Sequence, residues 1–241
     1  MKDSIASVIS QTYTHWELFV IDDASTDGTV SIVQNLEETN PQITLLRLNQ
    51  NQGTGAARNK GIEAATGTFI AFLDADDLWL PEKLEIQVNL MLEKDLVMTY
   101  SSYYLMAEDG KRLRNYVEAL PVLTYGKLLK SNYVGNLTGI YNARKTGKMY
   151  SPVFRKRQDW ALWLNLMKKA GPVEGILKPL AVYRKRSNSL SRNKTALVSY
   201  NFNIYHEFLQ FSFLKSCRYL AVFLWEHFFI KNSQVKSCSK I

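Results

Sequence analysis

Cysteine is nearly absent from the chain, which carries only Cys217 and Cys238 among 241 residues. Two cysteines near one end form neither a disulfide framework nor a metal-ligand spacing, which favours a reducing compartment. The first residues, MKDSIASVISQTY, contain no apolar core of signal-peptide length. The longest uncharged stretch near the C-terminus, YLAVFLW at 219–225, is far too short to span a bilayer. These absences together indicate a globular protein of the cytoplasm.

Acidic residues are outnumbered by basic ones, and the formal net charge is +8. A basic surface suits nucleic acid, anionic lipid or a phosphorylated substrate, and charge alone does not choose between them. The basic runs all follow the acidic clusters of the first hundred residues, at KRLR (111–114), FRKRQ (154–158) and YRKRS (183–187).

Short apolar runs alternate with helical periodicity over the first hundred residues. Strands are predicted at WELFVID (16–22), ITLLRL (43–48), TFIAFLD (68–74) and LVMTYSSYYLM (96–106). Helices are predicted between them at 29–38, 54–66 and 81–93. This alternation predicts an α/β fold, with a mainly parallel sheet flanked by helices on both faces.

The pattern is less regular after residue 106. It predicts a turn at 107–112, strands at 135–143 and 180–186, and a helix at 158–171 that ends at a glycine. A helical, aromatic-rich segment at 195–231 is broken near 212–216. We therefore expect a domain over residues 1–192 and a C-terminal helical extension over 193–241.

Two groups of carboxylates follow predicted strands: Asp22 and Asp23 in one, and Asp74, Asp76 and Asp77 in the other. Both groups should project from the same edge of the sheet, where ligands of such folds bind. Neighbouring carboxylates repel one another, which costs electrostatic free energy, and a bound Mg²⁺ or Mn²⁺ would offset that repulsion. Taken alone, the second cluster would be explained by favourable interaction with the dipole of the helix that follows it, and its position after a buried strand favours a functional role.

Three linked segments carry a family resemblance: VISQTYTHWELFVIDDASTDGT, NQGTGAARNKGI and GTFIAFLDADDLWLPEKL. In order and spacing they resemble the family 2 glycosyltransferases of GT-A fold, whose sheet is Rossmann-like. The resemblance runs from about Ile5 to about Ser191 and is far more specific than a lone DxD motif. It implies an inverting transferase of the bacterial cell-surface polysaccharide type.

The resemblance also implies where a nucleotide donor, expected to be a UDP-sugar, would bind. Asp23 would contact the base, with Asp22 beside it, because a strand-end carboxylate can accept a hydrogen bond from an imide N–H. Arg58 would lie near the nucleotide, although an ordinary helix-surface arginine explains it equally well.

The second acidic cluster looks like the family's metal–diphosphate site. Asp74 and Asp76 match the DxD pair, and Asp76 or Asp77 would hold the Mg²⁺ or Mn²⁺. Such an ion would neutralise the diphosphate leaving group as a Lewis acid.

The segment QDWALWL (158–164) resembles the family's later motif, whose aspartate is the general base. An acceptor hydroxyl is a weak nucleophile, so a positioned carboxylate must take its proton, and Asp159 fits that role. The family usually has an acid directly before this aspartate, where this chain has Gln158. Asp159 could also cap the helix that begins here, and the two roles are compatible.

YRKRSNSLS (183–191) resembles the loop that closes over the diphosphate in the family. Many members carry a histidine where this chain has Arg186, so a histidine ligand to the metal is not expected. Arg184 and Arg186 could pair with the phosphates instead, because a guanidinium fork matches their oxygens. A solvated basic loop is the alternative.

The chain begins inside the family's first helix, without the apolar first strand that normally precedes it. That strand would lie centrally in the sheet, and its omission would leave apolar edges and unpaired backbone groups. We expect either that the true start lies upstream or that the chain is a truncated, impaired copy. A non-catalytic nucleotide-binding or membrane-associated scaffold is therefore the alternative function, and a nucleotidyltransferase is a rival enzyme.

The expected reaction moves a sugar to a hydroxyl of a glycan or lipid-linked acceptor, with no nucleic acid as partner. Residues 201–231 are dense in Phe, Tyr, Trp and Leu, with basic flanks that suit anionic headgroups. They would place the protein peripherally on the inner face of the cell membrane, or else pack back on the domain.

Overall fold

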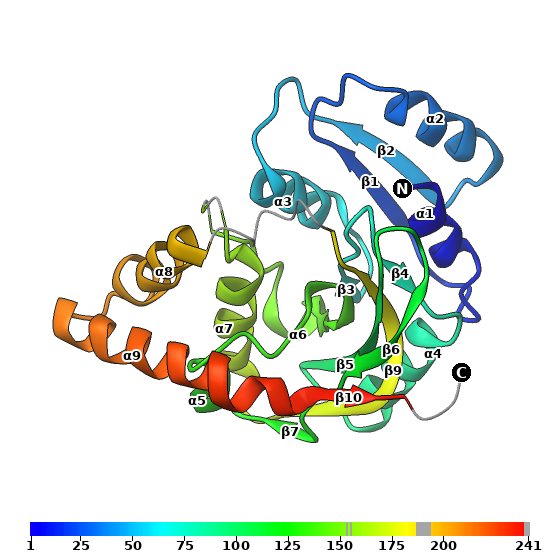
Figure 1. Cartoon of the computed structure of the whole chain (residues 1–241). Helices are drawn as coiled ribbons and strands as arrows, with labels where there is room; N and C mark the ends of the chain where they lie inside the picture. Colours follow the sequence, from blue (N-terminus) through cyan, green and yellow to red (C-terminus); the bar gives the residue numbers. More distant parts are fainter. Residues whose placement is uncertain (153, 155, 187–193, 239–241) are drawn as a thin grey trace.

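The computed structural model describes residues 1–152, 154, 156–186 and 194–238. Figure 1 shows strands and helices alternating through its first half. These elements are α1 (Lys2–Ile9), β1 (Leu18–Asp22), α2 (Thr29–Thr39), β2 (Ile43–Arg47), α3 (Thr54–Ala64), β3 (Phe69–Ala71), β4 (Leu78–Trp79), α4 (Lys83–Glu93) and β5 (Met98–Met106). The predicted alternation over the first hundred residues is confirmed.

The second half begins with a hairpin and continues through short elements to the long helix α7. Its elements up to β9 are β6 (Arg112–Val117), β7 (Val122–Leu123), α5 (Tyr125–Leu128), η1 (Asn136–Thr138), β8 (Ile140–Asn142), α6 (Ala143–Thr146), α7 (Gln158–Ala170) and β9 (Val173–Arg184). The C-terminal part contains α8 (Lys194–Asn203), η2 (Ile204–Phe208), α9 (Phe213–Trp225), η3 (Glu226–Ile230), η4 (Lys231–Gln234) and β10 (Val235–Ser237).

The strands form two sheets. β1 and β2 pair in parallel, and α2 covers them through Val33, which packs against Ile43. The larger sheet has the order β10-β6-β5-β8-β3, and β9 lies beside β5 and also pairs with β4 and β7. Among the described strands, β1 and β3 each pair with a single neighbour, so backbone hydrogen bonds do not join the two sheets.

The prediction of a mainly parallel sheet was wrong. Within the described residues the parallel pairs are β1–β2 and β5–β9, and the other six are antiparallel. β3 and β5 do run in the same direction, as the alternation requires. However, β8 comes back from later in the chain and pairs antiparallel with both of them. A local pattern of strands and helices cannot anticipate such an insertion.

Helix α7 forms the centre of the main core. Trp160, Trp163, Leu164 and Met167 are all fully buried there, as the apolar stripe of its sequence predicts. A Cβ on Gly139 would lie 2.5 Å from the Cη2 atom of Trp163, so only glycine lets the chain before β8 approach the helix this closely. The packing fixes the position of Asp159 in the first turn of α7.

The C-terminal segment packs back on the domain. The rings of Tyr205 and Phe223 lie 5.8 and 5.6 Å from the ring of Trp160, and β10 adds a strand to β6. In its described part, the extension expected at 193–241 is helical up to η4 and continues into β10, while its boundary at 192–193 falls outside the described residues. None of the helices in the described ranges is long and apolar enough to cross a membrane.

Candidate active site

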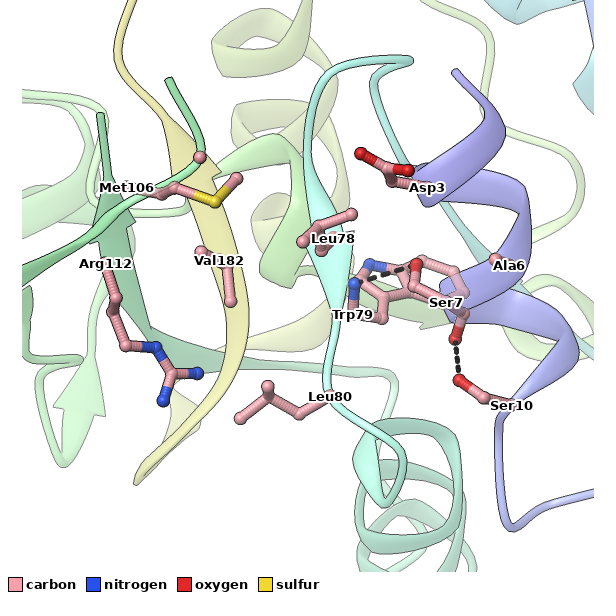
Figure 2. Close-up of a pocket in the computed structure, with 11 residues that line it drawn as sticks. Asp3, Ala6, Ser7, Ser10, Leu78, Trp79, Leu80, Met106, Arg112 and Val182 are labelled. Atoms are coloured by element: carbon pink, nitrogen blue, oxygen red, sulfur yellow. Dashed lines mark hydrogen bonds between the residues drawn. The ribbon is translucent and has the colours of Figure 1, made fainter. Parts of the chain in front are cut away.

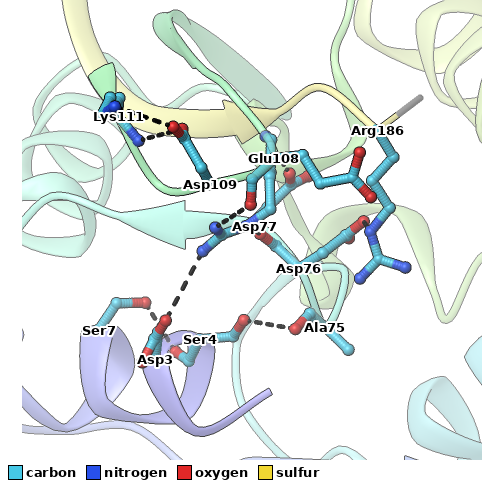
Figure 3. Close-up of polar contacts among 11 residues, drawn as sticks. Asp3, Ser4, Ser7, Ala75, Asp76, Asp77, Glu108, Asp109, Lys111 and Arg186 are labelled. Atoms are coloured by element: carbon cyan, nitrogen blue, oxygen red, sulfur yellow. Dashed lines mark hydrogen bonds and ion pairs between the residues drawn. The ribbon is translucent and has the colours of Figure 1, made fainter.

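The loop that carries the second acidic cluster is held between α1 and the end of β9 (Figure 3). The Ser4 hydroxyl donates to the carbonyl of Ala75 at 2.8 Å. From the other side, the backbone N–H of Arg184 donates to Asp77 Oδ1 at 2.9 Å, and its Nε donates to the carbonyl of Asp76 at 3.0 Å. Hydrogen bonds from α1 and from the end of β9, both far from this loop in the sequence, therefore fix its conformation.

The cluster does not cap the following helix. α4 has Glu82 as its N-cap residue, with no side-chain capping bond, and begins at Lys83. The alternative interpretation of the cluster as a helix cap is therefore excluded, and its carboxylates need another explanation.

Asp76 and Asp77 differ sharply in their surroundings. Asp77 is 1% exposed and accepts the N–H of Arg184, and burial raises its pKa to about 8, helped by the negative charges of Asp74 and Asp76. Asp76 keeps a partly exposed carboxylate that pairs with Arg186, with Nε 2.8 Å from Oδ2. The assignment of Asp77 as a metal ligand stays a prediction: its Oδ1 holds the backbone of β9, and the carboxylate of Asp76 is the more accessible of the two.

The side chain of Asp74 is 48% exposed. Its Oδ1 accepts from Asn136 Nδ2 at 3.1 Å and lies 3.4 Å from Nη2 of Arg58. Desolvation by the surrounding protein raises the pKa of Asp74, Arg58 opposes this, and the nearby charges of Asp159 and Asp76 raise it further. Arg58 is thus a partner of the cluster rather than an ordinary surface arginine.

Asp159 comes to this cluster from a distant part of the chain. Its Oδ2 accepts a 2.8 Å hydrogen bond from Asn132 Nδ2, and its charge acts on Asp74. The N-cap residue of α7 is Arg157, and no side chain caps this helix. Capping therefore does not explain Asp159, whose carboxylate is oriented by Asn132 instead.

The first acidic pair lies at the end of β1. Asp22 is buried, accepts the N–H of Ser25 at 3.2 Å and lies 3.5 Å from Arg47 Nε. The Asp23 oxygens accept the backbone N–H groups of Gln52 and Gly53 at 2.7 and 2.8 Å. A carboxylate has about four acceptor positions, so Asp23 keeps capacity for a ligand donor.

A chain of contacts joins this pair to Asp159. Gly53, held by Asp23, precedes Thr54, whose hydroxyl donates to Gln158 Oε1 at 2.9 Å. Gln158 in turn precedes Asp159 on α7. Gln158, which stands where the family usually has an acid, therefore links the two acidic sites. Its position in the sequence did not predict this role.

Arg184 and Arg186 also differ. The Arg184 guanidinium bonds the carbonyls of Asp76 and Glu108 and lies 3.6 Å from Asp3, so it serves mainly to hold the loop. The Arg186 side chain is 54% exposed, and its contact is the ion pair with Asp76. The rest of the predicted phosphate loop, 187–191, lies outside the described residues.

The acidic residues can hold a divalent cation only together with a ligand. The described residues contain no group of three His, Cys, Asp or Glu side chains arranged to hold a metal. Mg²⁺ and Mn²⁺ sites on nucleotides need only one or two carboxylates beside the phosphates, and Asp76, with Asp74 nearby, supplies these. Asp76 thus fits a cation that is bound together with a diphosphate.

The hollow shown in Figure 2 lies elsewhere. Asp3, Ser7, Trp79, Met106 and Arg112 line it between α1, β4 and the β5–β6 hairpin. None of the predicted site carboxylates lines this hollow, so it is separate from the candidate active site.

Residues 1–149 match the model of "Glycosyl transferase family 2". The chain belongs to this family. It is 39% identical over 216 residues to the "putative teichuronic acid biosynthesis glycosyltransferase TuaG" of Bacillus subtilis, covering 90% of this chain and 86% of that one. It is 34% identical over 209 residues to the Escherichia coli "UDP-Glc:alpha-D-GlcNAc-diphosphoundecaprenol beta-1,3-glucosyltransferase WfgD", covering 86% and 80%.

The fold agrees with this assignment. The structure superposes on S. aureus TarS 1–349 in complex with UDP-GlcNAc with a TM-score of 0.72 and 20% identity, covering 96% of this chain and 70% of that one. The chain is therefore a family 2 glycosyltransferase with the GT-A fold. The alternative of a non-catalytic scaffold has no support in these comparisons.

Proposed function

We propose that this glycosyltransferase moves a sugar from a UDP-sugar to a hydroxyl of a lipid-linked glycan, with inversion at the anomeric carbon. The observation that carries the proposal is the position of Asp159. Its carboxylate is held by Asn132 and lies close enough to Asp74 to raise the pKa of that residue. A carboxylate suited to be a base thus lies beside carboxylates suited to a diphosphate–metal pair.

In the proposed reaction, Asp159 accepts the proton of the acceptor hydroxyl as its oxygen bonds to the anomeric carbon. The bond from that carbon to the diphosphate breaks in the same step, and the electron pair leaves with the nucleoside diphosphate. A single displacement on the face opposite the leaving group inverts the configuration. Asn132 keeps the carboxylate oriented toward the acceptor, which lowers the entropic cost of the step.

The donor would lie between the two acidic sites. Asp23 is proposed to accept from the base, with buried Asp22 shaping the strand end beneath it. Arg58, through Asp74, and Arg186, through Asp76, are proposed to face the diphosphate. The complex of TarS with UDP-GlcNAc and the printed donor of WfgD, UDP-Glc, support a UDP-sugar.

A Mg²⁺ or Mn²⁺ ion held by Asp76, with Asp74 beside it, would supply Lewis-acid neutralisation of the leaving diphosphate. The carboxylates that raise one another's pKa in its absence would then be stabilised in their charged form.

The acceptor is proposed to be a lipid-linked glycan of a surface polysaccharide, since the name of WfgD specifies a diphosphoundecaprenol-linked sugar and that of TuaG teichuronic acid. Such an acceptor would bring the protein to the inner face of the cell membrane. The exposed side chains of Phe213, Leu214, Trp225 and Phe229 are suited to that contact.

A thermal-shift panel of UDP-, GDP- and dTDP-sugars with Mn²⁺ tests the donor assignment. A ligand at 100 times its Kd adds about 2.7 kcal/mol to the free energy of unfolding. We expect UDP-sugars to raise the Tm, and Asp23→Asn to reduce that shift, whereas Asp109→Asn on the β5–β6 turn leaves it unchanged. Stabilisation by GDP- or dTDP-sugars alone would contradict the donor class.

A further inference from the structure

The charge of Asp159 acts on two basic side chains with which it forms no ion pair in the described part of the chain. Arg157 lies two residues before it, and Lys231 reaches the same place from η4. Within the described residues, neither cation forms an ion pair with a carboxylate. Burial lowers the pKa of Lys231 to about 8, the charge of Arg157 lowers it further, and Asp159 opposes both effects. Two like charges are thus held together, which an anionic ligand would relieve.

The hydrogen-bonding capacity of these cations is only partly used. Lys231 donates to the carbonyl of Asn132 and lies 5.6 Å from the centre of the Tyr133 ring. An ammonium has three donors, so others remain. The Arg157 guanidinium lies 5.8 Å from the centre of the Phe223 ring, and its buried Nε has no hydrogen-bond partner in the described structure. An unpartnered guanidinium nitrogen matches a phosphate oxygen.

The segment that delivers Lys231 is also apolar and exposed. Trp225, Phe228 and Phe229 directly precede it and are 60%, 52% and 68% exposed. The nearby acid on this segment, Glu226, is buried, and its Oε1 already accepts from Lys127 and from the Tyr133 hydroxyl. The same few residues therefore present a cation toward the base and hydrocarbon toward solvent.

We propose that Arg157 and Lys231 bind the diphosphate of an isoprenoid-diphosphate-linked acceptor, and that Trp225, Phe228 and Phe229 contact its hydrocarbon chain. This assignment rests on the proposed function and adds the residues that select the acceptor. In such an acceptor the sugar is bonded directly to the diphosphate, so its hydroxyls lie one ring away from the phosphates. The anion site must then adjoin the base, as Arg157 and Lys231 adjoin Asp159.

A phospholipid headgroup fits these two cations less well. Headgroups meet the exposed basic residues of an interfacial helix, such as Lys215 and Arg218 on α9. Arg157 and Lys231 lie instead within the site, against aromatic rings and the base. A phosphate carried into the site with the acceptor would reach them.

Calorimetric titration with farnesyl diphosphate tests the site in the presence of saturating UDP and Mn²⁺, which fill the donor diphosphate site. We expect Arg157→Gln and Lys231→Gln each to weaken binding by about tenfold or more, because each removes a charge-assisted hydrogen bond. Lys236→Gln, which changes an exposed lysine of β10, should leave binding unchanged. Unaltered affinity in both site variants, with UDP still bound, would overturn the proposal.

Further ligands identify the source of the phosphate. If inorganic pyrophosphate binds as tightly as farnesyl diphosphate, the hydrocarbon chain contributes nothing to binding, and the proposed contact with Trp225, Phe228 and Phe229 is excluded. Phosphatidylglycerol vesicles that displace farnesyl diphosphate from the wild type, but not from Lys231→Gln, would reassign the cations to a headgroup. If farnesyl diphosphate binding depends on Arg157 and Lys231 but the protein has no transferase activity, the proposed function is contradicted and the binding site is not.

A charge-conserving variant covers the case in which the glutamine variants do not fold. The charged and titratable groups around Lys231 are Arg157, Asp159, Tyr133 and the Glu226–Lys127 pair. Since the pKa of Lys231 is lowered to about 8, wild-type affinity for farnesyl diphosphate should fall between pH 7 and pH 9. Lys231→Arg, which stays charged, should lose this fall, and an identical fall in both proteins would contradict the role of Lys231.

Discussion

Asp159→Asn is expected to lower sugar transfer by about 10² to 10⁴-fold, the usual contribution of a general base. The amide keeps the size of the carboxylate and can still accept from Asn132, so the first turn of α7 should remain intact. It cannot take a proton from the acceptor hydroxyl. The measurement is the single-turnover transfer rate, with donor affinity determined on the same samples by titration.

The donor affinity separates a lost base from a damaged site. It should stay within about twofold of wild type, because Asp159 acts on the acceptor side of the reaction. Asp109→Asn, the same chemical change on an exposed turn, serves as the control for both quantities. A transfer rate equal to wild type would remove Asp159 from the mechanism.

Asp76→Ala is expected to abolish the dependence of donor binding on Mn²⁺ and to lower turnover by about 10²-fold or more, as when a stabiliser of transition-state charge is lost. The carboxylate of Asp76 is the one that the loop leaves available, paired with the exposed Arg186. Stability should change little, because that pair is near the surface. UDP titrations with and without Mn²⁺ measure the effect.

Asp77→Asn is the matched comparison for that result. The structure places Asp77 under the backbone of Arg184, where its raised pKa of about 8 already favours the neutral form at pH 7. The amide should therefore preserve the Mn²⁺ dependence of UDP binding. If Asp77→Asn loses the Mn²⁺ dependence of UDP binding and Asp76→Ala keeps it, then Asp77 and not Asp76 holds the cation.

Much of the site could be predicted from the sequence because its members end strands or begin a helix. Asp74 follows β3 and Asp159 starts α7, positions that the apolar periodicity locates directly. The sheet was predicted less well, since β8 enters between β3 and β5 from about 40 residues later and reverses the pairing. Pairings of that kind depend on tertiary packing, which a local pattern does not contain.

The residues that orient the site were not predicted. Asn132 and Asn136 belong to none of the motifs that predict the site, yet they donate hydrogen bonds to Asp159 and Asp74. Arg184 lies in a predicted phosphate-binding motif, but its guanidinium donates to the carbonyl of Asp76 and pairs with Asp3 of α1. A single sequence gives the chemical types of such residues and leaves their partners to the fold.

The anomeric configuration of the product tests most directly whether Asp159 acts as base in a single displacement. The ¹H NMR coupling of the anomeric proton, recorded on the product of an α-linked UDP-sugar, reports it. The proposed mechanism predicts a β-linked product. An α-linked product would require two displacements or a front-face reaction, and would contradict the role of Asp159 as the base.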